Sequence, residues 1–264
     1  MFQRLMVVVA AIATFALSAQ DFGGLSRAPR APQGQPAPRR ADGKPDFSGV
    51  YHSPGYGPGD PRSKTGEGYA HNIARDLTPA DVPMLPWAAK LYKERFDNES
   101  KDDPEGFCLP MGTPRVNPYP WKIVQTDKLF VILYEGNVHS YRQVFLDGRG
   151  HDKNAGDTWW GDSIGHWDGD ALVVDTAGMN DRAWLDADGH PRTTKAHIIE
   201  RFTRPELGKV VVDITIDDPG AYSKPWNVHE VAQLASGWEI MENVCNENQD
   251  ENGNNLDVKH LVGK

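Results

Sequence analysis

The side chains best suited to chemistry are densest in residues 139–167, which combine histidines, aspartates and aromatic rings. Within this stretch Asp162 and His166 stand four residues apart, close to the adjacent Trp159 and Trp160. A carboxylate beside an imidazole is the usual arrangement for orienting a general base, and aromatic rings can form the walls of a ligand cleft. The spacing therefore predicts an acid–base pair of Asp162 and His166 beside an aromatic wall. The alternative is that both tryptophans only pack against the core.

Further candidates lie on runs that alternate polar and apolar side chains. Arg142 and Arg201 are the candidates for stabilising a negative charge that develops on a substrate. The positions assigned to ligand contact are Trp159, Trp160, Tyr141, His197, Trp226 and His229. Polar residues at positions that otherwise face a core predict a cavity lined with hydrogen-bonding groups. The alternative for each of them is the outward face of a half-exposed strand.

No cofactor and no metal ion are predicted. The histidines that could bind an ion are His139, His151, His166, His197 and His229. A protein metal site needs three or four ligands that converge, and none of these histidines has a spacing that singles it out. The chain also lacks the GxxxxGK[ST] loop and the HExxH helix that mark well-known catalytic sites. The expected partner is a small organic molecule.

Two cysteines, Cys108 and Cys245, are too few for a disulfide-rich scaffold or an iron–sulfur cluster. Both lie in loop-like sequence, far apart along the chain. In an exported protein they are most simply one disulfide, and the alternative is a cysteine nucleophile. The bridge would join the proline-rich segment before the strand-rich region to the segment after its last strand.

The N-terminus has the three parts of a secretory signal peptide. Arg4 precedes an apolar run over 5–17, and small residues follow it. This run is shorter than the ~20 residues that a membrane-spanning helix needs, so no membrane span is predicted. We expect a signal peptide at 1–19 and a periplasmic or extracellular location. Residues 20–44 are rich in proline and arginine, which predicts a flexible tether before a single domain at 45–264.

The composition excludes one class of partner and favours one class of fold. Of the 264 residues, 28 are basic and 37 acidic, and the net charge of −9 argues against a surface built to bind nucleic acid. Hydrophobic residues make up 39% of the chain, which is enough for a packed core. The 26 glycines and 20 prolines predict a turn-rich, mainly β chain.

Short runs of β-branched and aromatic residues alternate with turn signals after residue 121 and predict strands. The predicted strands cover 122–125, 129–134, 140–146, 163–167, 171–175, 197–203, 210–216, 228–234 and 238–244. Asp168 and Gly169 favour a tight hairpin turn between two of them. One short helix is predicted at 87–96, between long loops rich in proline and glycine. Helices are too few for repeated parallel crossovers, which leaves an antiparallel meander.

Closing this meander removes exposed sheet edges, so the sequence predicts a barrel of roughly eight to ten strands. Residues 47–51 are a candidate for an additional strand. A two-sheet sandwich is the competing arrangement.

Several strings resemble an uncharacterised family of exported bacterial proteins over residues 45–250. They are PDFSGV at 45–50, CLP at 108–110 with PR at 114–115, FLDGR at 145–149, WGDSIGHWDGD at 160–170, ERF at 200–202 and TIDDP at 215–219. The resemblance implies no particular activity. The hairpin at WDGD also resembles those of lipocalin-like (calycin) barrels, which mostly hold small apolar ligands and sometimes host enzymes. The tail CNEN at 245–248 departs from the Cys-His-Glu form of the family.

These patterns predict a secreted lipocalin-like barrel that acts on a small aromatic or cyclic organic molecule as a cofactor-independent lyase, hydrolase or isomerase. The catalytic hypothesis requires Asp162, His166 and an arginine in one pocket. A non-catalytic binding protein with the same cavity is the first alternative. A carbohydrate-binding module is the second, and it requires at least two coplanar tryptophans on an open surface.

Overall fold

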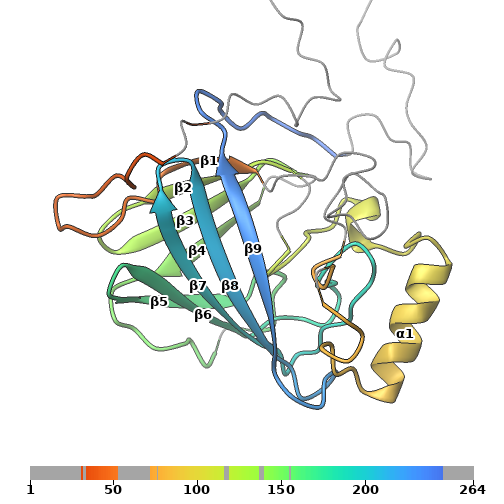
Figure 1. Cartoon of the computed structure of the whole chain (residues 1–264). Helices are drawn as coiled ribbons and strands as arrows, with labels where there is room; N and C mark the ends of the chain where they lie inside the picture. Colours follow the sequence, from red (N-terminus) through yellow and green to blue (C-terminus); the bar gives the residue numbers. More distant parts are fainter. Residues whose placement is uncertain are drawn as a thin grey trace, which may run out of the picture.

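A computed structural model describes residues 31, 34–52, 72–75, 77–115, 119–136, 140–154 and 156–245, which form a mainly β structure (Figure 1). Its elements are β1 (Gly49–His52), α1 (Pro86–Asp97), the short 3₁₀ helix η2 (Pro104–Phe107), β2 (Trp121–Gln125), β3 (Leu129–Tyr134), β4 (Ser140–Phe145), β5 (Asp162–Asp168), β6 (Ala171–Ala177), β7 (His197–Glu206), β8 (Lys209–Asp217) and β9 (Trp226–Leu234). The predicted signal peptide and the first part of the predicted tether lie outside the described residues, as does His139.

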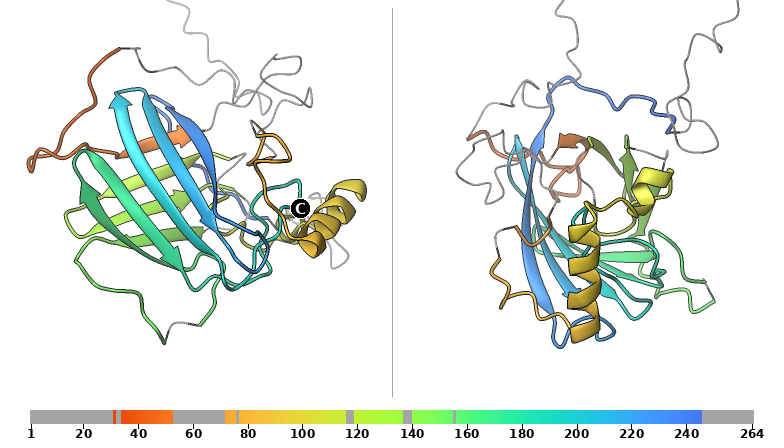
Figure 2. Two further views of the ribbon diagram at one scale, coloured as in Figure 1. Left: turned by 60° about the horizontal axis from the view of Figure 1, so that its bottom comes forward. Right: turned by 90° about the vertical axis from the view of Figure 1, so that its right-hand side faces the viewer.

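The nine strands of the described residues close into a barrel in sequence order. Each strand pairs with the next one along the chain, and β9 returns to pair with β1, where Leu234 lies opposite Tyr51. The left view of Figure 2 shows β5 to β9 as one continuous curved wall. The predicted barrel is therefore confirmed, and the competing sandwich is not formed.

One junction departs from the predicted antiparallel meander, because β4 and β5 are parallel, with Val144 opposite Ser163. Closure requires such a junction. Around a closed ring the number of antiparallel junctions must be even, and nine strands have nine junctions. A parallel pair needs a long crossover connection, which here runs over residues 146–161. This crossover carries His151.

Eight of the nine predicted strands are confirmed to within three residues at each end. The ninth, at 238–244, is wrong, because this segment has no regular structure. The edge of β9 that it would need is already paired with β1. Trp238 and Ile240 pack instead against Val50 and Ala235.

Side chains alternate between the barrel interior and its outer wall. On β6, Leu172, Val174 and Thr176 are fully buried, whereas Val173 and Asp175 face outward. The interior is filled mainly by branched and aromatic side chains, among them Ile123, Phe130, Ile132, Val144, Leu172, Val174, Ile198, Phe202, Ile214 and Ile216. Because one face of each strand must remain inside, this core fixes the register of the wall.

Phe47 packs at the barrel end where β2 finishes. Its ring makes edge-to-face contacts with Phe130 and Phe202, at centroid distances of 5.9 and 6.5 Å. Its backbone N–H donates to Oε1 of Gln125 at 2.8 Å. The chain before β1 is thereby anchored to the barrel core.

The connection between β6 and β7 packs against α1 (Figure 1). The predicted helix is confirmed, and it begins with Pro86, whose ring suits the first helical position. Tyr92 stacks on His190 at 4.2 Å between ring centroids, and Arg95 lies over the ring of Trp184 at 4.3 Å. No helix among the described residues is long and apolar enough to cross a membrane.

The predicted disulfide is confirmed. Cys108, directly after η2, is bonded to Cys245, which lies beyond β9. The two cysteines are 137 residues apart, and closing so long a loop contributes ~5 kcal/mol in the chain-entropy model. The bridge therefore ties the loop before β2 to the chain that leaves the barrel.

Residues 34–44, the described end of the predicted tether, contact the barrel. The N–H of Leu207 donates to the carbonyl oxygen of Gln35 at 2.8 Å. Arg39 forms an exposed ion pair with Asp170 at 2.6 Å. This part of the chain therefore lies along the barrel before β1 begins.

Candidate functional site

Three neighbouring strands present polar side chains on the outer wall. Asp162 begins β5, Asp175 lies near the end of β6, and His197 begins β7. The register of the three strands places Ile164, Asp175 and Ile199 side by side. Since alternate residues of a strand share a face, the three polar side chains emerge on the same side of the wall and at the same end of the barrel.

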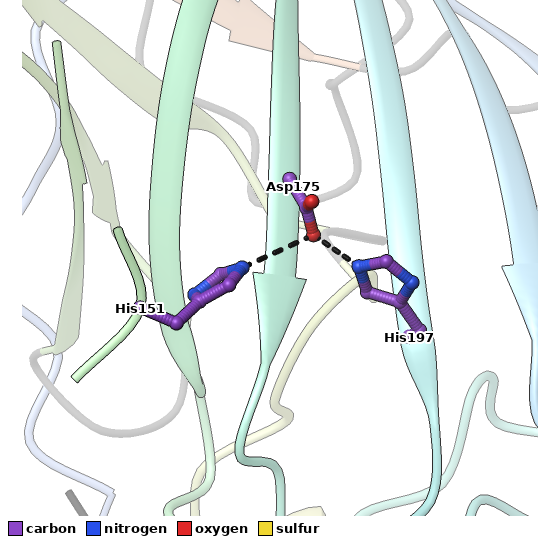
Figure 3. Close-up of side chains that lie close together, drawn as sticks. All are labelled: His151, Asp175 and His197. Atoms are coloured by element: carbon purple, nitrogen blue, oxygen red, sulfur yellow. Dashed lines mark hydrogen bonds and ion pairs between the residues drawn. The ribbon is translucent and has the colours of Figure 1, made fainter. Parts of the chain in front are cut away.

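The β4–β5 crossover places His151 over these strands. Nδ1 of His151 lies 3.0 Å from Oδ2 of Asp162, which also accepts a hydrogen bond from the backbone N–H of Asp152. Nε2 of the same ring lies 3.3 Å from Oδ1 of Asp175, and Nε2 of His197 contacts that oxygen too. Figure 3 shows the two imidazoles pointing at one carboxylate from opposite sides. We call His151, Asp162, Asp175 and His197 the wall cluster.

The wall cluster is half-buried. The side chains of His151, Asp175 and His197 are 28%, 33% and 39% exposed, so water and small molecules can reach them. Nε2 of His151 is nevertheless shielded from solvent and makes no hydrogen bond to the described residues. A shielded ring nitrogen without a hydrogen bond lowers the stability of the folded protein unless a proton or a metal ion binds to it.

The end of the crossover is held close to β6. Gly161 has a φ of +72°, and a Cβ at this position would stand 2.7 Å from the carbonyl oxygen of Ala177, so glycine is required there. Buried Arg192 donates to the carbonyl oxygens of Trp159 at 3.3 Å and Asn180 at 2.9 Å. Burial lowers the pKa of Arg192 to about 10, which still leaves it charged at neutral pH. These contacts fix the chain directly before β5.

A second polar cluster lies on the inner side of the same strands. Arg142 donates to Ser163 at 2.9 Å, to Thr176 at 2.5 Å and to Glu200 at 2.5 Å. We call these four residues the inner cluster. Burial acts to lower the pKa of Arg142, but the adjacent Glu200 carboxylate outweighs it and raises that pKa above its ordinary value. The ion pair is therefore charged although both side chains are almost fully buried.

The structure gives Asp162 a different partner from the predicted one. Asp162 contacts His151, whereas His166 is exposed further along β5, opposite Val173. Of the two predicted arginines, Arg142 belongs to the inner cluster and Arg201 pairs on the outer wall with Asp168 at 2.7 Å. Among the described residues, Asp162, His166 and an arginine are therefore not gathered in one pocket.

The predicted tryptophan contacts are packed against other side chains. Trp160 stacks on Tyr134, with ring centroids 4.3 Å apart, and the guanidinium of Arg182 lies 4.7 Å over Trp159. Trp226 is buried. These tryptophans thus do not form the open coplanar platform that sugar stacking requires.

The other predicted ligand contacts are spread around the barrel. Tyr141 is exposed on β4, and His229 is exposed on β9, where it pairs with Asp213 at 2.7 Å. Of the predicted ligand-contact residues, His197 is the one that belongs to the wall cluster.

Sequence reasoning does not identify Asp175 or the partners of His151. Asp175 appears in the sequence as the polar end of a predicted strand, and 22 residues separate it from His197. No short motif joins residues so far apart. The single available signal is that Asp175 interrupts an apolar strand at an outward position, and its meaning depends on the register of the neighbouring strands.

The chain matches no protein-family model, no curated protein and no solved structure. The resemblance drawn from its motifs therefore stays a prediction.

Proposed function

We propose that this protein hydrolyses a small organic molecule at the wall cluster. The observation that carries the proposal is the convergence of two imidazole nitrogens and one carboxylate oxygen on the half-exposed outer wall. The proposal keeps the small organic substrate expected from the sequence and narrows the expected lyase, hydrolase or isomerase to a hydrolase. It transfers the acid–base role from His166 to His151 and His197.

The chemistry follows from the way the groups face each other. Asp162 holds one nitrogen of His151, and the other nitrogen points at Asp175. Electron-pair donors that face one point favour a positive species between them, either a proton or a metal ion. An imidazole nitrogen without a proton can accept a proton from a water molecule as it attacks, and a metal ion would lower the pKa of a water molecule bound to it. In either case that water is the nucleophile of the hydrolysis.

Access to solvent favours hydrolysis over the other two reaction classes. Lyases and isomerases that pass through carbanions gain from excluding water from the site. The wall cluster is open instead, with His197 39% exposed, so water is always available as a co-substrate.

The surroundings of the cluster favour a neutral substrate with an apolar part. Ile164 and Ile199 flank Asp175 on the two neighbouring strands and offer apolar contact on the outer wall. Asp147, Asp152, Asp162 and Asp175 outnumber the nearby Arg149, and this excess of negative charge disfavours an anionic substrate. A small ester, lactone or amide combines the required properties.

The proposed location is outside the cytoplasm. The disulfide between Cys108 and Cys245 supports this location, because such bonds persist in oxidising compartments. A substrate for the protein would then be a molecule of the periplasm or the cell surroundings.

The test is turnover of a panel of small aryl esters, lactones and anilides by the mature chain. Since a positioned acid–base group contributes about 10²–10⁴ in rate, His197→Gln should lower kcat/KM at least ~100-fold. His166→Gln replaces an exposed histidine of the same wall outside the cluster, and it should stay within about twofold of the wild type. Turnover of no panel member contradicts the hydrolase. Binding of a panel member without turnover would favour the non-catalytic binding protein.

A further inference from the structure

Three potential metal ligands lie close together in the wall cluster. Nε2 of His151, Oδ1 of Asp175 and Nε2 of His197 all lie within 4.8 Å of one another. They come from the crossover, β6 and β7, so two strands of the barrel wall and one connection supply them. Nitrogen and oxygen donors in this ratio, two imidazoles and one carboxylate, form the protein ligand set of many zinc and iron sites.

The proton on His151 is on the far side of the ring from Asp175. An ionised carboxylate can only accept hydrogen bonds, so the contact with Asp162 places the proton on Nδ1. When the ring carries this proton alone, Nε2 directs a lone pair at Oδ1 of Asp175, which also carries lone pairs. Two acceptors that face each other repel unless a positive charge lies between them.

One of the three ligand distances matches the spacing of two ligands around a metal ion, whereas His197 contacts Asp175 directly. Two ligands that each lie about 2.0–2.1 Å from a tetrahedral zinc ion are about 3.3–3.4 Å from each other. The observed distance from Nε2 of His151 to Oδ1 of Asp175 is 3.3 Å. The contact is not a hydrogen bond, since Nε2 of His151 has no hydrogen-bond partner among the described residues, and it is an ion pair only when the ring is doubly protonated.

Charge balance favours a divalent ion. Asp175 and Asp162 together offer two carboxylates, and an imidazole that ligates a metal ion does so without a charge of its own. The half-exposed position of His197 leaves a side of the site open, where a water molecule can take the fourth position.

We infer that His151, Asp175 and His197 bind a divalent transition-metal ion of the zinc type, with Asp162 as a positioning residue that orients His151. The inference deepens the proposed function, since it rests on the same wall cluster; with an ion bound, the two imidazoles serve as ligands and the ion activates the water in their place. A carboxylate behind a ligating histidine is a recurrent feature of zinc sites, where it fixes the ring and raises its basicity.

The site would also connect the crossover to the barrel wall. His151 is the one proposed ligand outside the strands, and its other contacts to the wall cluster run through Asp162. Metal binding should therefore raise the Tm of the protein, because an ion that binds only the folded state stabilises it.

The test is metal binding by tag-free mature protein that has been treated with a chelator and dialysed. Titration with Zn²⁺, followed by calorimetry and by elemental analysis, should give one ion per chain. Co²⁺ in the same site should give visible absorption bands of a low-coordinate ion. His197→Gln and Asp175→Asn should abolish both signals, and Asp162→Asn should keep the stoichiometry while weakening Zn²⁺ binding ~10–100-fold.

His229→Gln is the matched control. His229 is also an outer-wall histidine paired with an aspartate, Asp213, but it lies on β9 outside the wall cluster. Its replacement should leave Zn²⁺ affinity unchanged. Circular dichroism in the presence of chelator checks that every variant is folded. Substoichiometric Zn²⁺ in the wild type, or equal Zn²⁺ affinity in His197→Gln, would overturn the inference.

The metal site and the hydrolase fail in different ways. Zn²⁺ binding is measured without substrate, so stoichiometric binding with no turnover supports the metal site and contradicts the hydrolase. Turnover by protein that binds no stoichiometric Zn²⁺ overturns the metal site and leaves the hydrolase in place.

Discussion

Strands β5, β6 and β7 carry two polar clusters on opposite faces of one wall. The inner cluster uses Ser163, Thr176 and Glu200 of these strands, and the wall cluster uses Asp162, Asp175 and His197. On β5 and β6 the members are direct neighbours in sequence, so a shift of one residue would exchange the faces. The same short stretches of chain thus build two sites in opposite environments.

The two clusters differ in how completely their polar atoms are partnered. Arg142 is 2% exposed and donates to three side chains of the inner cluster, while its charge is matched by Glu200. In the wall cluster, Nε2 of His151 has no hydrogen-bond partner among the described residues, and the site is open to solvent. A saturated buried cluster has no group left to bind a ligand, so its role is to hold the fold. An unsaturated exposed one is available for chemistry.

Breaking the inner cluster should give the largest effect on stability. Arg142→Met leaves Glu200 charged and buried without its partner, which should lower the free energy of unfolding by ~3–5 kcal/mol. The double variant Arg142→Met/Glu200→Leu should recover most of this loss, because apolar side chains of similar volume replace the whole pair. Urea denaturation followed by circular dichroism measures both. A double variant as unstable as the single one would contradict the unpaired charge as the cause.

The buried pair of His190 and Asp186 can be compared with the half-buried pair of His151 and Asp162, which has the same two residue types. Asp186 accepts from His190 Nδ1 at 2.6 Å and from three backbone N–H groups, those of Ile73, Gly189 and His190. Burial acts to raise the pKa of Asp186, but the charge and hydrogen bonds of His190 outweigh it and hold that pKa below its ordinary value.

Such a depressed pKa stabilises the protein above the unfolded-state pKa of ~3.9, and this contribution is lost as pH falls toward the folded-state pKa. We expect Asp186→Asn to cost about 1–3 kcal/mol at pH 7, since it removes partners of buried donors. Below pH 4 the difference between wild type and variant should shrink. Denaturant titrations from pH 7 to pH 2 measure this, and a difference independent of pH would argue against the depressed pKa.

The smallest effect is expected for an exposed pair on the wall. Arg201 and Asp168 are 42% and 64% exposed, and surface ion pairs of this kind contribute about 0–1 kcal/mol. Arg201→Ala should therefore change neither the free energy of unfolding by more than ~1 kcal/mol nor turnover of the ester panel by more than about twofold. A large loss of turnover with unchanged stability would place Arg201 in the site, as its sequence position predicts.

Most of the barrel was predictable because its strands alternate strongly. Leu129–Tyr134 matches its predicted range at both ends, and the helix is within one residue at each end. The segment at 238–244 has the same kind of composition, yet it is not a strand, because closure leaves it no edge to pair with. Local preference therefore indicates where strands can form, and only the complete ring determines which of them are used.

The candidate site was predictable in its residue types but not in its partners. His151 and His197 both stood among the possible ligands, and Asp162 among the catalytic candidates. Their assembly depends on Asp175, which acquires a role only when β5 and β7 flank β6 in the observed register. The register is set by buried side chains of all three strands at once, and no local pattern contains that information.

The sequence by itself determined a mainly β chain, the positions of eight strands and one helix, and a pair of cysteines in place for a bridge. The tertiary structure decided the rest through closure. Nine strands in a ring require one parallel junction, a parallel junction requires a long crossover, and that crossover places His151 beside Asp162 and Asp175. The wall cluster therefore depends on how the barrel closes, because its members are well separated in the sequence and only the closed barrel places them side by side.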